Sequence, residues 1–541
     1  MIELNNLNFR YKINTPPVLS DINFKINPGE KTLIAGKNGA GKTTLSKILS
    51  GIIPNVEKGK IKGQYLFQNR DINAYEYKNL VKNISILFQD FETQIISTSV
   101  KEELVFYPLN TGAGYKEALK KAEELAEKFG LTGLLTRNIY ELSGGEKQKI
   151  ALLSLLVINP EVLILDEPFT DIEPASRQFI LDFLKSGEYK GNVILFEQSL
   201  DYYGYFDRII IINDGKILFD GDKSAVKDKG LLSSAGLAAP GAYKVFPGGI
   251  NEDLIKERYW FDEKEYETIT GYKKEETETI LESKNLYFKY ADINTQTIDN
   301  INFEIKKGDF VAVTGANGSG KTTLMKILAG IIKPEYGFIF YNGMSIKDKM
   351  LSGDIGYVYQ NPDNQIFAET VYDEIAFILR MQKMNEARIR DRVDSLMRTM
   401  GLYEKKDMDP FILPKGDREK IACASIIVAE PEIIILDEPT TGLDYPSLLE
   451  LMGIIEGLNK KGHTILMITH AMETAALYGN KIMALNEGRV IFYGDKRRFF
   501  SDENLLVAAK ITRTEIMDLS LKLNSKLLLN ENEFIQCWRE K

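Results

Sequence analysis

The chain has 541 residues, of which 44% are hydrophobic and 27% charged, a balance typical of folded globular proteins. Its 68 basic and 77 acidic side chains give a net charge of −9, so we expect no nucleic-acid partner. Two cysteines are too few for a disulfide framework or a cysteine-rich metal cluster. Apolar runs stay well below the roughly 18–20 residues that span a bilayer, and Met1–Lys12 lacks a signal-peptide pattern. We therefore expect no membrane-spanning segment.

One sequence pattern occurs twice along the chain. Leu7–Tyr11 returns as Leu286–Tyr290, and Val162–Glu167 returns as Ile433–Glu438. The offset between the copies falls from 279 to 271, so the first copy carries eight additional residues, around Gln64–Lys78. A repeat of this length predicts a duplicated domain, and each copy is long enough to bury its own core.

Short β-branched runs alternate with amphipathic stretches inside each copy. In chain order we expect strands at Thr32–Ala35 and Phe310–Val313, followed by helices at Thr43–Leu49 and Thr322–Leu328. This alternation predicts an α/β fold with a mostly parallel sheet in each domain. The expected organisation is domain 1 (residues 1–221), a linker rich in Gly, Pro and charge (222–279), domain 2 (280–496) and a C-terminal helical extension (497–541).

A glycine-rich loop joins the expected strand to the expected helix in each copy. Both loops fit the phosphate-loop pattern, in which glycines let backbone N–H groups approach phosphate and the lysine reaches the β- and γ-phosphate oxygens. The threonine after the lysine is a candidate Mg²⁺ ligand. The candidate ATP-binding residues are Gly36, Asn38, Gly39, Gly41, Lys42, Thr43 and Thr44 in the first loop, and Gly315, Asn317, Gly318, Gly320, Lys321, Thr322 and Thr323 in the second.

Two adjacent carboxylates follow an apolar strand in each copy. Asp166 and Asp437 end the strands, which would present each carboxylate to Mg²⁺. Glu167 and Glu438 come next and are candidate general bases, because a carboxylate there can polarise the attacking water.

The segment Leu142–Glu146 reads LSGGE and precedes Asp166 by about 20 residues. With the phosphate loop and the paired carboxylates, it makes the chain resemble the ABC ATPase family over nearly its whole length. The resemblance implies a small antiparallel β subdomain and a helical signature subdomain beside each core sheet, with ATP and Mg²⁺ as cofactors. It also implies nucleotide contacts by the signature of the opposite domain, through Ser143, Gly144, Gly145 and Glu146.

Further site residues follow from the same resemblance. Gln89 and Gln360 match glutamines that touch the metal and the water. Tyr11 and Tyr290 match an aromatic residue that stacks on adenine, although a packed surface tyrosine would give the same pattern. His470 matches the family's switch histidine, whereas the first copy has Gln198 there, which cannot become cationic.

The second signature is degraded, because Pro414 stands where the first copy has Ser143. The spacing from the preceding glutamine is 54 residues in both copies, which secures the alignment. In the family, each nucleotide lies between the phosphate loop of one domain and the signature of the other. We therefore expect intramolecular pairing of the domains, with a competent site on Lys321, Asp437, Glu438 and His470 and a degenerate site on Lys42, Asp166, Glu167 and Gln198. One departure affects the competent site: Asp171-Ile-Glu173 stands where the second copy has Gly442-Leu-Asp444.

The stretch Tyr359–Phe367 (YQNPDNQIF) resembles the extended Q-loop of energy-coupling-factor (ECF) and cobalt importers, and Phe88–Ile96 keeps part of it. An ordinary ABC importer loop with chance similarity is the alternative. The resemblance implies a peripheral protein at the cytoplasmic face of the cell membrane, working with a separate transmembrane coupling subunit and a substrate-binding membrane subunit to import a vitamin or transition-metal ion. The methionines that follow fit either a docking groove or core packing, and core packing is favoured: Met381, Met384, Met397 and Met400.

Two other functions remain open. One is the ATPase of another ABC transporter class. The other is a translation factor of the ABC F subfamily, which also pairs two ATPase domains. That subfamily resembles this chain less, because its members keep two intact signatures and carry a basic interdomain helix, whereas Pro414 breaks one signature here and the linker is acidic.

Overall fold

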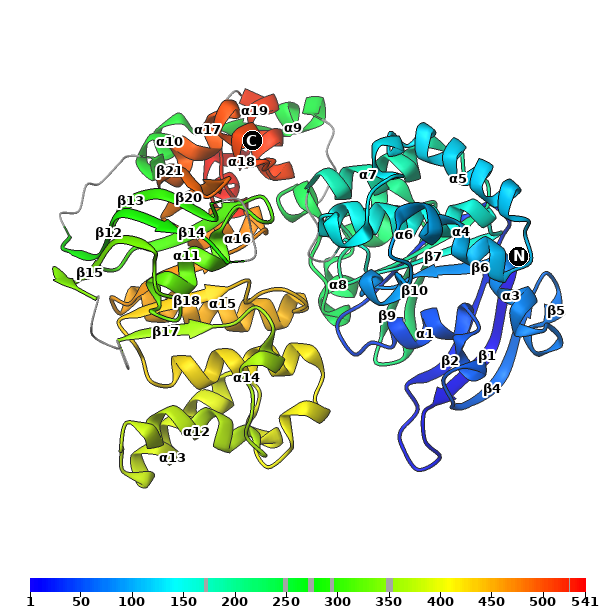
Figure 1. Cartoon of the computed structure of the whole chain (residues 1–541), viewed down its shortest axis with the longest axis horizontal. Helices are drawn as coiled ribbons and strands as arrows, with labels where there is room; N and C mark the ends of the chain where they lie inside the picture. Colours follow the sequence, from blue (N-terminus) through cyan, green and yellow to red (C-terminus); the bar gives the residue numbers. More distant parts are fainter. Residues whose placement is uncertain (170–173, 247–251, 271–276, 292–295, 347–353, 525) are drawn as a thin grey trace. The chain divides into compact units, whose positions relative to one another are not determined.

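The computed structural model describes residues 1–169, 174–246, 252–270, 277–291, 296–346, 354–524 and 526–541. These residues form two compact units, Met1–Tyr243 and Lys244–Lys541 (Figure 1). Asp171-Ile-Glu173, which the sequence marked as a departure from the family pattern, lies outside the described residues. Among the described residues, no helix is long and apolar enough to cross a membrane.

A six-stranded sheet forms the centre of the first unit, in the order β10-β9-β3-β8-β7-β6. Its strands are parallel except for the antiparallel pair β9–β10. Their bounds are β3 Lys31–Ala35, β6 Ile84–Leu87, β7 Val162–Asp166, β8 Asn192–Glu197, β9 Arg208–Asn213 and β10 Lys216–Gly221. Strands β7 and β8 are buried at every position, which explains the apolar runs Val162–Leu165 and Val193–Phe196 within them. The carboxyl ends of β3, β7 and β8 carry the candidate site.

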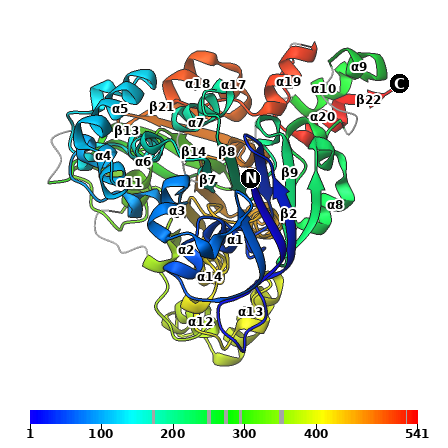
Figure 2. The ribbon, with the colours of Figure 1, turned by 90° about the vertical axis from the view of Figure 1, so that its right-hand side faces the viewer.

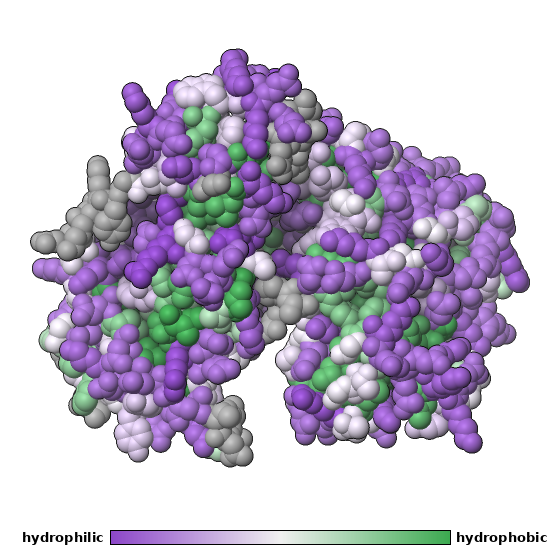
Figure 3. All heavy atoms as spheres, turned by 90° about the horizontal axis from the view of Figure 1, so that it is seen from above, coloured by the Kyte–Doolittle hydropathy of each residue, from purple (hydrophilic) through white to green (hydrophobic). Residues whose placement is uncertain are grey.

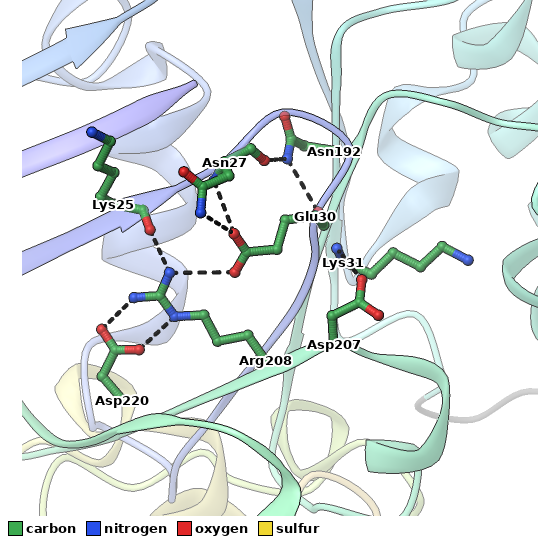
Figure 4. A network of polar contacts seen from close by, with 8 residues as sticks. All are labelled: Lys25, Asn27, Glu30, Lys31, Asn192, Asp207, Arg208 and Asp220. Atoms are coloured by element: carbon green, nitrogen blue, oxygen red, sulfur yellow. Dashed lines mark hydrogen bonds and ion pairs between the residues drawn. The ribbon is translucent and has the colours of Figure 1, made fainter.

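A second, antiparallel sheet of the first unit has the order β2-β1-β4-β5. Its bounds are β1 Ile2–Arg10, β2 Leu19–Ile26, β4 Lys60–Phe67 and β5 Arg70–Asp71. Arg208 of β9 links the two sheets (Figure 4): its guanidinium bonds both carboxylate oxygens of Asp220, at 2.5 and 2.6 Å, and lies 3.3 Å from Glu30 and against the Lys25 carbonyl. Bidentate pairing with Asp220 of β10 fixes the guanidinium, which also contacts Glu30 in the turn before β3.

The helices of the first unit are α1 Lys42–Leu49, α2 Ile52–Asn55, α3 Tyr77–Asn83, α4 Val100–Asn110, α5 Tyr115–Lys128, α6 Gly144–Ile158, α7 Pro174–Ser186 and α8 Lys229–Ala235. Helices α4, α5 and α6 form a subdomain with its own apolar core, which includes Leu104, Ala126 and Leu153. Alanines at every fourth position of α5 (Ala118, Ala122 and Ala126) let this helix approach its neighbours closely.

The second unit repeats this architecture. Its central sheet runs β17-β18-β19-β14-β20-β21 and its antiparallel sheet runs β13-β12-β15-β16. Helices α12, α13 and α14 lie together beyond β17 (Figure 1). The bounds are β12 Thr279–Phe288, β13 Ile298–Lys306, β14 Phe310–Gly315, α11 Lys321–Leu328, β15 Tyr336–Tyr341, β16 Met344–Ser345, β17 Ile355–Val358, α12 Val371–Met381, α13 Glu386–Thr399, α14 Lys415–Ile427, β18 Ile433–Asp437, α15 Tyr445–Lys460, β19 Thr464–Ile468, α16 Met472–Tyr478, β20 Lys481–Asn486 and β21 Arg489–Asp495. The α/β prediction, with its antiparallel and helical subdomains, is confirmed in both units.

The segment predicted as a linker is divided between the units at Tyr243. Its later part forms α9 Glu252–Arg258, β11 Tyr259–Phe261 and α10 Glu263–Thr270. These elements pack with the end of the chain, which forms α17 Lys496–Ser501, α18 Glu503–Ala509, α19 Glu515–Asn524, α20 Glu531–Cys537 and β22 Trp538–Glu540. Strand β11 pairs with β22, and Figure 2 shows α9, α10, α20 and β22 gathered together. We call this group the C-terminal layer.

Aromatic side chains hold the C-terminal layer together. Trp538 is buried, and its ring lies 5.5 Å from Phe261, 6.2 Å from Phe534 and 6.5 Å from Phe246. Residues from the start and the end of the second unit thus share one small core. The face seen in Figure 3 is mainly hydrophilic, with smaller hydrophobic patches.

Candidate functional site

The first phosphate loop runs from β3 to α1 and wraps the Lys42 side chain. Lys42 is buried, and its Nζ donates to the carbonyls of Gly36 at 2.8 Å and Lys37 at 3.1 Å. Gly41 has φ +100°, a conformation that glycine adopts readily. A Cβ on Gly36 would lie 2.3 Å from the Ile212 carbonyl, so this position has no room for a side chain.

The second phosphate loop, from β14 to α11, repeats this geometry. Lys321 Nζ donates to the carbonyls of Gly315 and Ala316, both at 2.9 Å. Gly320 has φ +97°, and a Cβ on Gly315 would lie 2.1 Å from the Leu485 carbonyl. Both loops therefore have the backbone that phosphate binding requires.

The two tyrosines expected to stack on adenine occupy matching positions. Tyr11 packs edge-on against Phe9, with ring centroids 4.8 Å apart, and its hydroxyl lies 3.2 Å from Thr44 Oγ1. Tyr290 packs in the same way on Phe288, and its hydroxyl lies 3.3 Å from Thr323 Oγ1. The Tyr11 ring is exposed, so its face is open to a planar ligand.

The strand-end aspartates are buried beside the loops. Asp166 Oδ2 accepts a hydrogen bond from Ser46 Oγ at 2.7 Å, while Oδ1 is buried and has no hydrogen-bond partner among the described residues. Burial, with a smaller contribution from Glu167, raises the pKa of Asp166 to about 6. Asp437 accepts from Thr322 Oγ1 at 3.2 Å and from the Tyr357 hydroxyl at 2.8 Å, and burial raises its pKa as well.

This donor set fits Mg²⁺. The ion prefers carboxylate and hydroxyl oxygens and usually combines one or two carboxylates with water and substrate phosphates. The unpartnered Oδ1 of Asp166 and the adjoining Thr322 and Asp437 oxygens are donors of this kind. The described residues contain no cluster of three or more His, Cys, Asp or Glu suited to a metal, so the nucleotide would have to supply the remaining ligands.

The glutamates after the aspartates are held differently in the two units. Both have positive φ, +49° at Glu167 and +52° at Glu438, a strained conformation often found at functional positions. Glu167 Oε1 lies 3.2 Å from Lys42 Nζ, and its Oε2 accepts from Gln198 Nε2 at 2.7 Å. Glu438 Oε1 lies 3.2 Å from His470 Nε2, and its Oε2 accepts from Gln360 Nε2 at 3.3 Å.

The structure therefore brings most predicted site residues together within each unit: the loop lysine, the aspartate, the glutamate and the switch residue. Both Q-loop glutamines are exposed, and Gln360 joins its group through a hydrogen bond to Glu438. The signature residues lie instead at the N-terminus of α6, in the helical subdomain. Ser143 Oγ accepts from the Glu146 N–H at 3.3 Å and Glu146 Oε2 accepts from the Ser143 N–H at 2.9 Å, which forms a capping box.

The degraded signature has lost this cap. Helix α14 begins after Pro414, which supplies no side-chain hydrogen bond to the helix N-terminus. The loss of the serine hydroxyl in the second copy therefore changes the local structure as well as the sequence, because the helix N-terminus has no side-chain cap.

Several site residues were not predicted. Ser46 and Tyr357 bond the strand-end aspartates. Glu197 ends β8 and is buried, and desolvation, followed by repulsion from Glu167, raises the pKa of its carboxyl to about 8. The corresponding residue in the second unit is Thr469, whose hydroxyl accepts from the Ala471 N–H at 3.0 Å. A charged residue ending an otherwise apolar strand was the available signal for Glu197.

Comparisons with known proteins agree with this geometry. The family model described as "ABC transporter" matches residues 19–170 and 298–441, together more than half of the chain. A candidate ABC transporter ATP-binding protein of Caldanaerobacter subterraneus subsp. tengcongensis is 35% identical over 99% of this chain and 98% of its own length. A counterpart from Streptococcus pneumoniae serotype 4 is 33% identical over 97% of this chain and 96% of its own length.

Two solved structures are similar to a part of this chain about as long as one domain. The protein cbiO1 from Clostridium perfringens, part of the ABC transporter complex cbiONQ, is 35% identical, with 43% of this chain and 94% of that chain covered and a TM-score of 0.39. The ATP-binding cassette MJ0796, seen as a dimer in a post-hydrolysis state with ADP and Pi, is 26% identical, with 40% and 98% covered and a TM-score of 0.38. On the family match and the full-length relatives, the chain belongs to the ABC transporter family, as an ATP-binding and ATP-hydrolysing subunit with two ABC domains.

Proposed function

We propose that this ATPase powers an ECF-type importer of a vitamin or transition-metal ion through separate membrane subunits, from the cytoplasmic face of the cell membrane. We also propose that one of its two sites carries most of the ATP turnover. The observation that carries the first proposal is an exposed apolar side chain on each Q-loop, on a backbone that buried polar groups hold in place.

The second Q-loop shows this construction clearly. Gln365 folds the loop back, because its Oε1 accepts from the Tyr359 N–H at 3.1 Å and its Nε2 donates to the Ala422 carbonyl at 2.7 Å. The buried Glu374 carboxylate accepts from the N–H groups of Phe367 and Ala368, at 2.9 and 2.8 Å. Phe367 is nevertheless 60% exposed. The loop thus fixes its backbone and presents an aromatic ring to the surroundings.

The first Q-loop has the same construction. Gln94 bonds the Phe88 N–H at 2.8 Å and the Ile86 carbonyl at 2.9 Å, and the buried Glu103 accepts from the Ile96 and Ser97 N–H groups. Ile96 is 65% exposed. Because both loops are built alike, we infer that both present a docking residue.

In the second unit, neighbouring side chains extend the apolar surface. Phe367 meets the half-exposed Phe377 of α12 edge-on, with centroids 4.8 Å apart, and Met381 of α12 is 67% exposed. Of the other methionines in this stretch, Met397 and Met400 are buried in the core, as favoured, and Met384 packs against it. Contiguous exposed apolar side chains mark binding sites more often than bare surface. The proposed occupant is a coupling helix of the membrane subunit, whose apolar side chains would bury these rings.

The YQNPDNQIF sequence of the second Q-loop favours an ECF-type partner over other transporter classes. In that arrangement the cargo lies in a separate membrane subunit. Closure of the two ATPase domains on ATP would then move the coupling subunit and release the cargo inside the cell.

The proposed asymmetry rests on the contacts of the two glutamates. Glu438 accepts a hydrogen bond from Gln360 and lies 3.2 Å from His470 Nε2, so one carboxylate is near both the switch histidine and the Q-loop. This arrangement suits a base that polarises water. Glu167 is instead paired with Lys42 and bonded by Gln198, which cannot become cationic. When bound, Mg²⁺ would neutralise developing charge on the phosphates. We propose that the domains pair crosswise, so that Ser143, Gly144 and Gly145 serve the Lys321 site and the degraded signature serves the Lys42 site.

Copurification tests the membrane role. The tagged chain is isolated from detergent-solubilised membranes of the organism that produces it. We expect integral membrane proteins to copurify with it in fixed proportion. The double variant F367S/M381S should lose them, while V507S, at a 77% exposed position on α18, should keep them. Melting temperatures of the variants check folding. Recovery of ribosomes, or equal recovery of membrane partners by all variants, would contradict the proposal.

A further inference from the structure

The two units hold their strand-end aspartates with different hydrogen-bond donors. In the first unit the donor is Ser46, on α1, which lies 2.7 Å from Asp166 Oδ2. In the second unit it is Tyr357, on β17, whose hydroxyl lies 2.8 Å from Asp437 Oδ2. The same carboxylate oxygen, Oδ2, accepts the hydrogen bond in both units, but the donor comes from a helix in the first unit and from a strand in the second.

Each donor is present in one unit, and the aligned position of the other unit carries a residue that cannot donate. The position of Ser46 is taken by Met325 in the second unit, and the position of Tyr357 is taken by Ile86 in the first. Neither Met325 nor Ile86 can donate such a bond, and both are buried in the core of their units. Each unit therefore has one donor for the aspartate at these two positions, and loss at one position coincides with gain at the other.

Both hydrogen bonds are buried, which makes them consequential. Ser46 is fully buried and Asp166 nearly so, and Tyr357 and Asp437 are also buried. Burying a carboxylate without hydrogen bonds is strongly unfavourable, and a hydrogen bond from a neutral donor to a carboxylate is about twice as strong as one between two neutral groups. The bond also fixes the rotation of the carboxylate, since it occupies Oδ2.

The remaining oxygen is the one available for binding. In the first unit Asp166 Oδ1 has no hydrogen-bond partner among the described residues, and in the second Asp437 Oδ1 lies 3.2 Å from the Thr322 hydroxyl. Holding Oδ2 thus leaves Oδ1 of Asp166 for the Mg²⁺ that accompanies the nucleotide. In the second unit Oδ1 of Asp437 accepts a hydrogen bond from Thr322 Oγ1, itself a candidate Mg²⁺ ligand, so the ion would bind beside both oxygens.

We infer that Tyr357 is a positioning residue for Mg²⁺–nucleotide binding in the second unit, where its hydroxyl fixes the Asp437 carboxylate, and that Ser46 does the same for Asp166 in the first. This inference rests on the proposed role of the two aspartates as metal ligands. Outer residues that orient a metal ligand typically contribute about 10- to 100-fold in metal affinity.

The test measures Mn²⁺ binding by electron paramagnetic resonance, on the full chain with a non-hydrolysable ATP analogue. The wild-type chain should bind two ions. Y357F, which keeps the buried ring, should weaken one of them about 10-fold. S46A should weaken the other by a similar factor, and S46A/Y357F should weaken both.

Rescue separates a positioning role from packing. M325S/Y357F places the donor of the first unit into the second, so one hydroxyl is restored at a different element. This variant should regain the affinity that Y357F lost, while M325S alone should bind as wild type. Melting temperatures without metal monitor the core, because shortening the buried Met325 leaves a cavity.

Unchanged Mn²⁺ affinity in Y357F would overturn the inference, and so would a loss that M325S does not restore. If two ions bind and neither affinity changes in Y357F, the aspartates can still be the metal ligands, and only the positioning role of Tyr357 is rejected. A wild-type chain that binds no Mn²⁺ with the nucleotide would instead reject the proposed metal site itself.

Discussion

Lys42 and Glu167 form a buried ion pair in the first unit, with Lys42 Nζ 3.2 Å from Glu167 Oε1 and only 4% and 6% of the two side chains exposed. This lysine is also the residue expected to bind the nucleotide phosphates. The carboxylate and the phosphates therefore compete for one cation. Breaking a buried pair by removing one partner costs about 3–5 kcal/mol, because the other charge stays buried and uncompensated.

Glu167→Gln should accordingly tighten ATP binding at the first unit. The nucleotide-free chain loses stability, whereas bound phosphate neutralises Lys42. We expect an affinity about tenfold higher, equivalent to about 1.4 kcal/mol. Fluorescent-nucleotide titration in a K321A background, which disables the second loop, measures it. An affinity equal to or weaker than that of K321A alone would show that Glu167 does not compete.

The buried Glu197 carboxyl predicts a pH dependence of stability. Its pKa is raised from about 4.5 to about 8 on folding, so the folded state holds its proton over that interval and the unfolded state does not. The stability it contributes is complete at low pH and is lost as pH rises through about 8. Glu197→Gln, which mimics the protonated carboxyl, should remove this loss.

The measurement is the melting temperature without nucleotide or metal, from acidic to alkaline pH. The melting temperature of the variant should rise relative to that of the wild type as the pH increases. The groups facing Glu197 include Glu167 and Lys42, and Asp166, with a pKa of about 6, adds a slope of the same sign at lower pH. Both chains share that slope, so their difference isolates Glu197. Parallel curves at every pH would contradict the assignment.

The switch residues should differ in importance. His470→Ala removes the group 3.2 Å from Glu438 and should lower steady-state ATP hydrolysis by about 10²-fold, the low end for general acid–base groups. Gln198→Ala removes an uncharged partner of Glu167 and should leave most of the rate. Steady-state phosphate release under saturating Mg²⁺–ATP compares them. A larger loss in Q198A than in H470A would reverse the proposed asymmetry.

The C-terminal layer depends on one of the chain's two tryptophans. Trp538→Ala should destabilise the layer by about 3–5 kcal/mol, the usual cost of truncating a buried aromatic residue. Hydrogen exchange of the β11 amides, Tyr259–Phe261, should accelerate, because β11 pairs with β22. Trp260→Ala is the matched control: its side chain is 44% exposed, so exchange should change little. Similar exchange in both variants would show that Trp538 does not anchor β11.

The sequence predicted the parts of the molecule that depend on local pattern. Strand–loop–helix order at Lys42 and Lys321 and the aspartates at strand ends follow from glycine placement and apolar runs. The fold class followed from the same alternation of strands and helices, because covered parallel strands are apolar at every position.

Tertiary contacts were beyond the sequence. Ser46 and Tyr357 carry no motif, and their role is visible only when α1 and β17 lie beside the strand-end aspartates. The pairing of Glu167 with Lys42 likewise joins residues that are distant in the sequence, and the positive φ of the glutamate is not evident from the residue pattern. The packing of the later linker segment with the chain end could not be predicted either. The three residues of β11 form a strand by pairing with β22, which is far away in the sequence.

The central claim is that one site, with Glu438 as its base, carries most of the turnover. The direct test compares ATP hydrolysis by Glu438→Gln and Glu167→Gln in the otherwise intact chain. We expect about a hundredfold loss for Glu438→Gln, and a rate close to wild type for Glu167→Gln. Equal losses in the two variants would contradict the account.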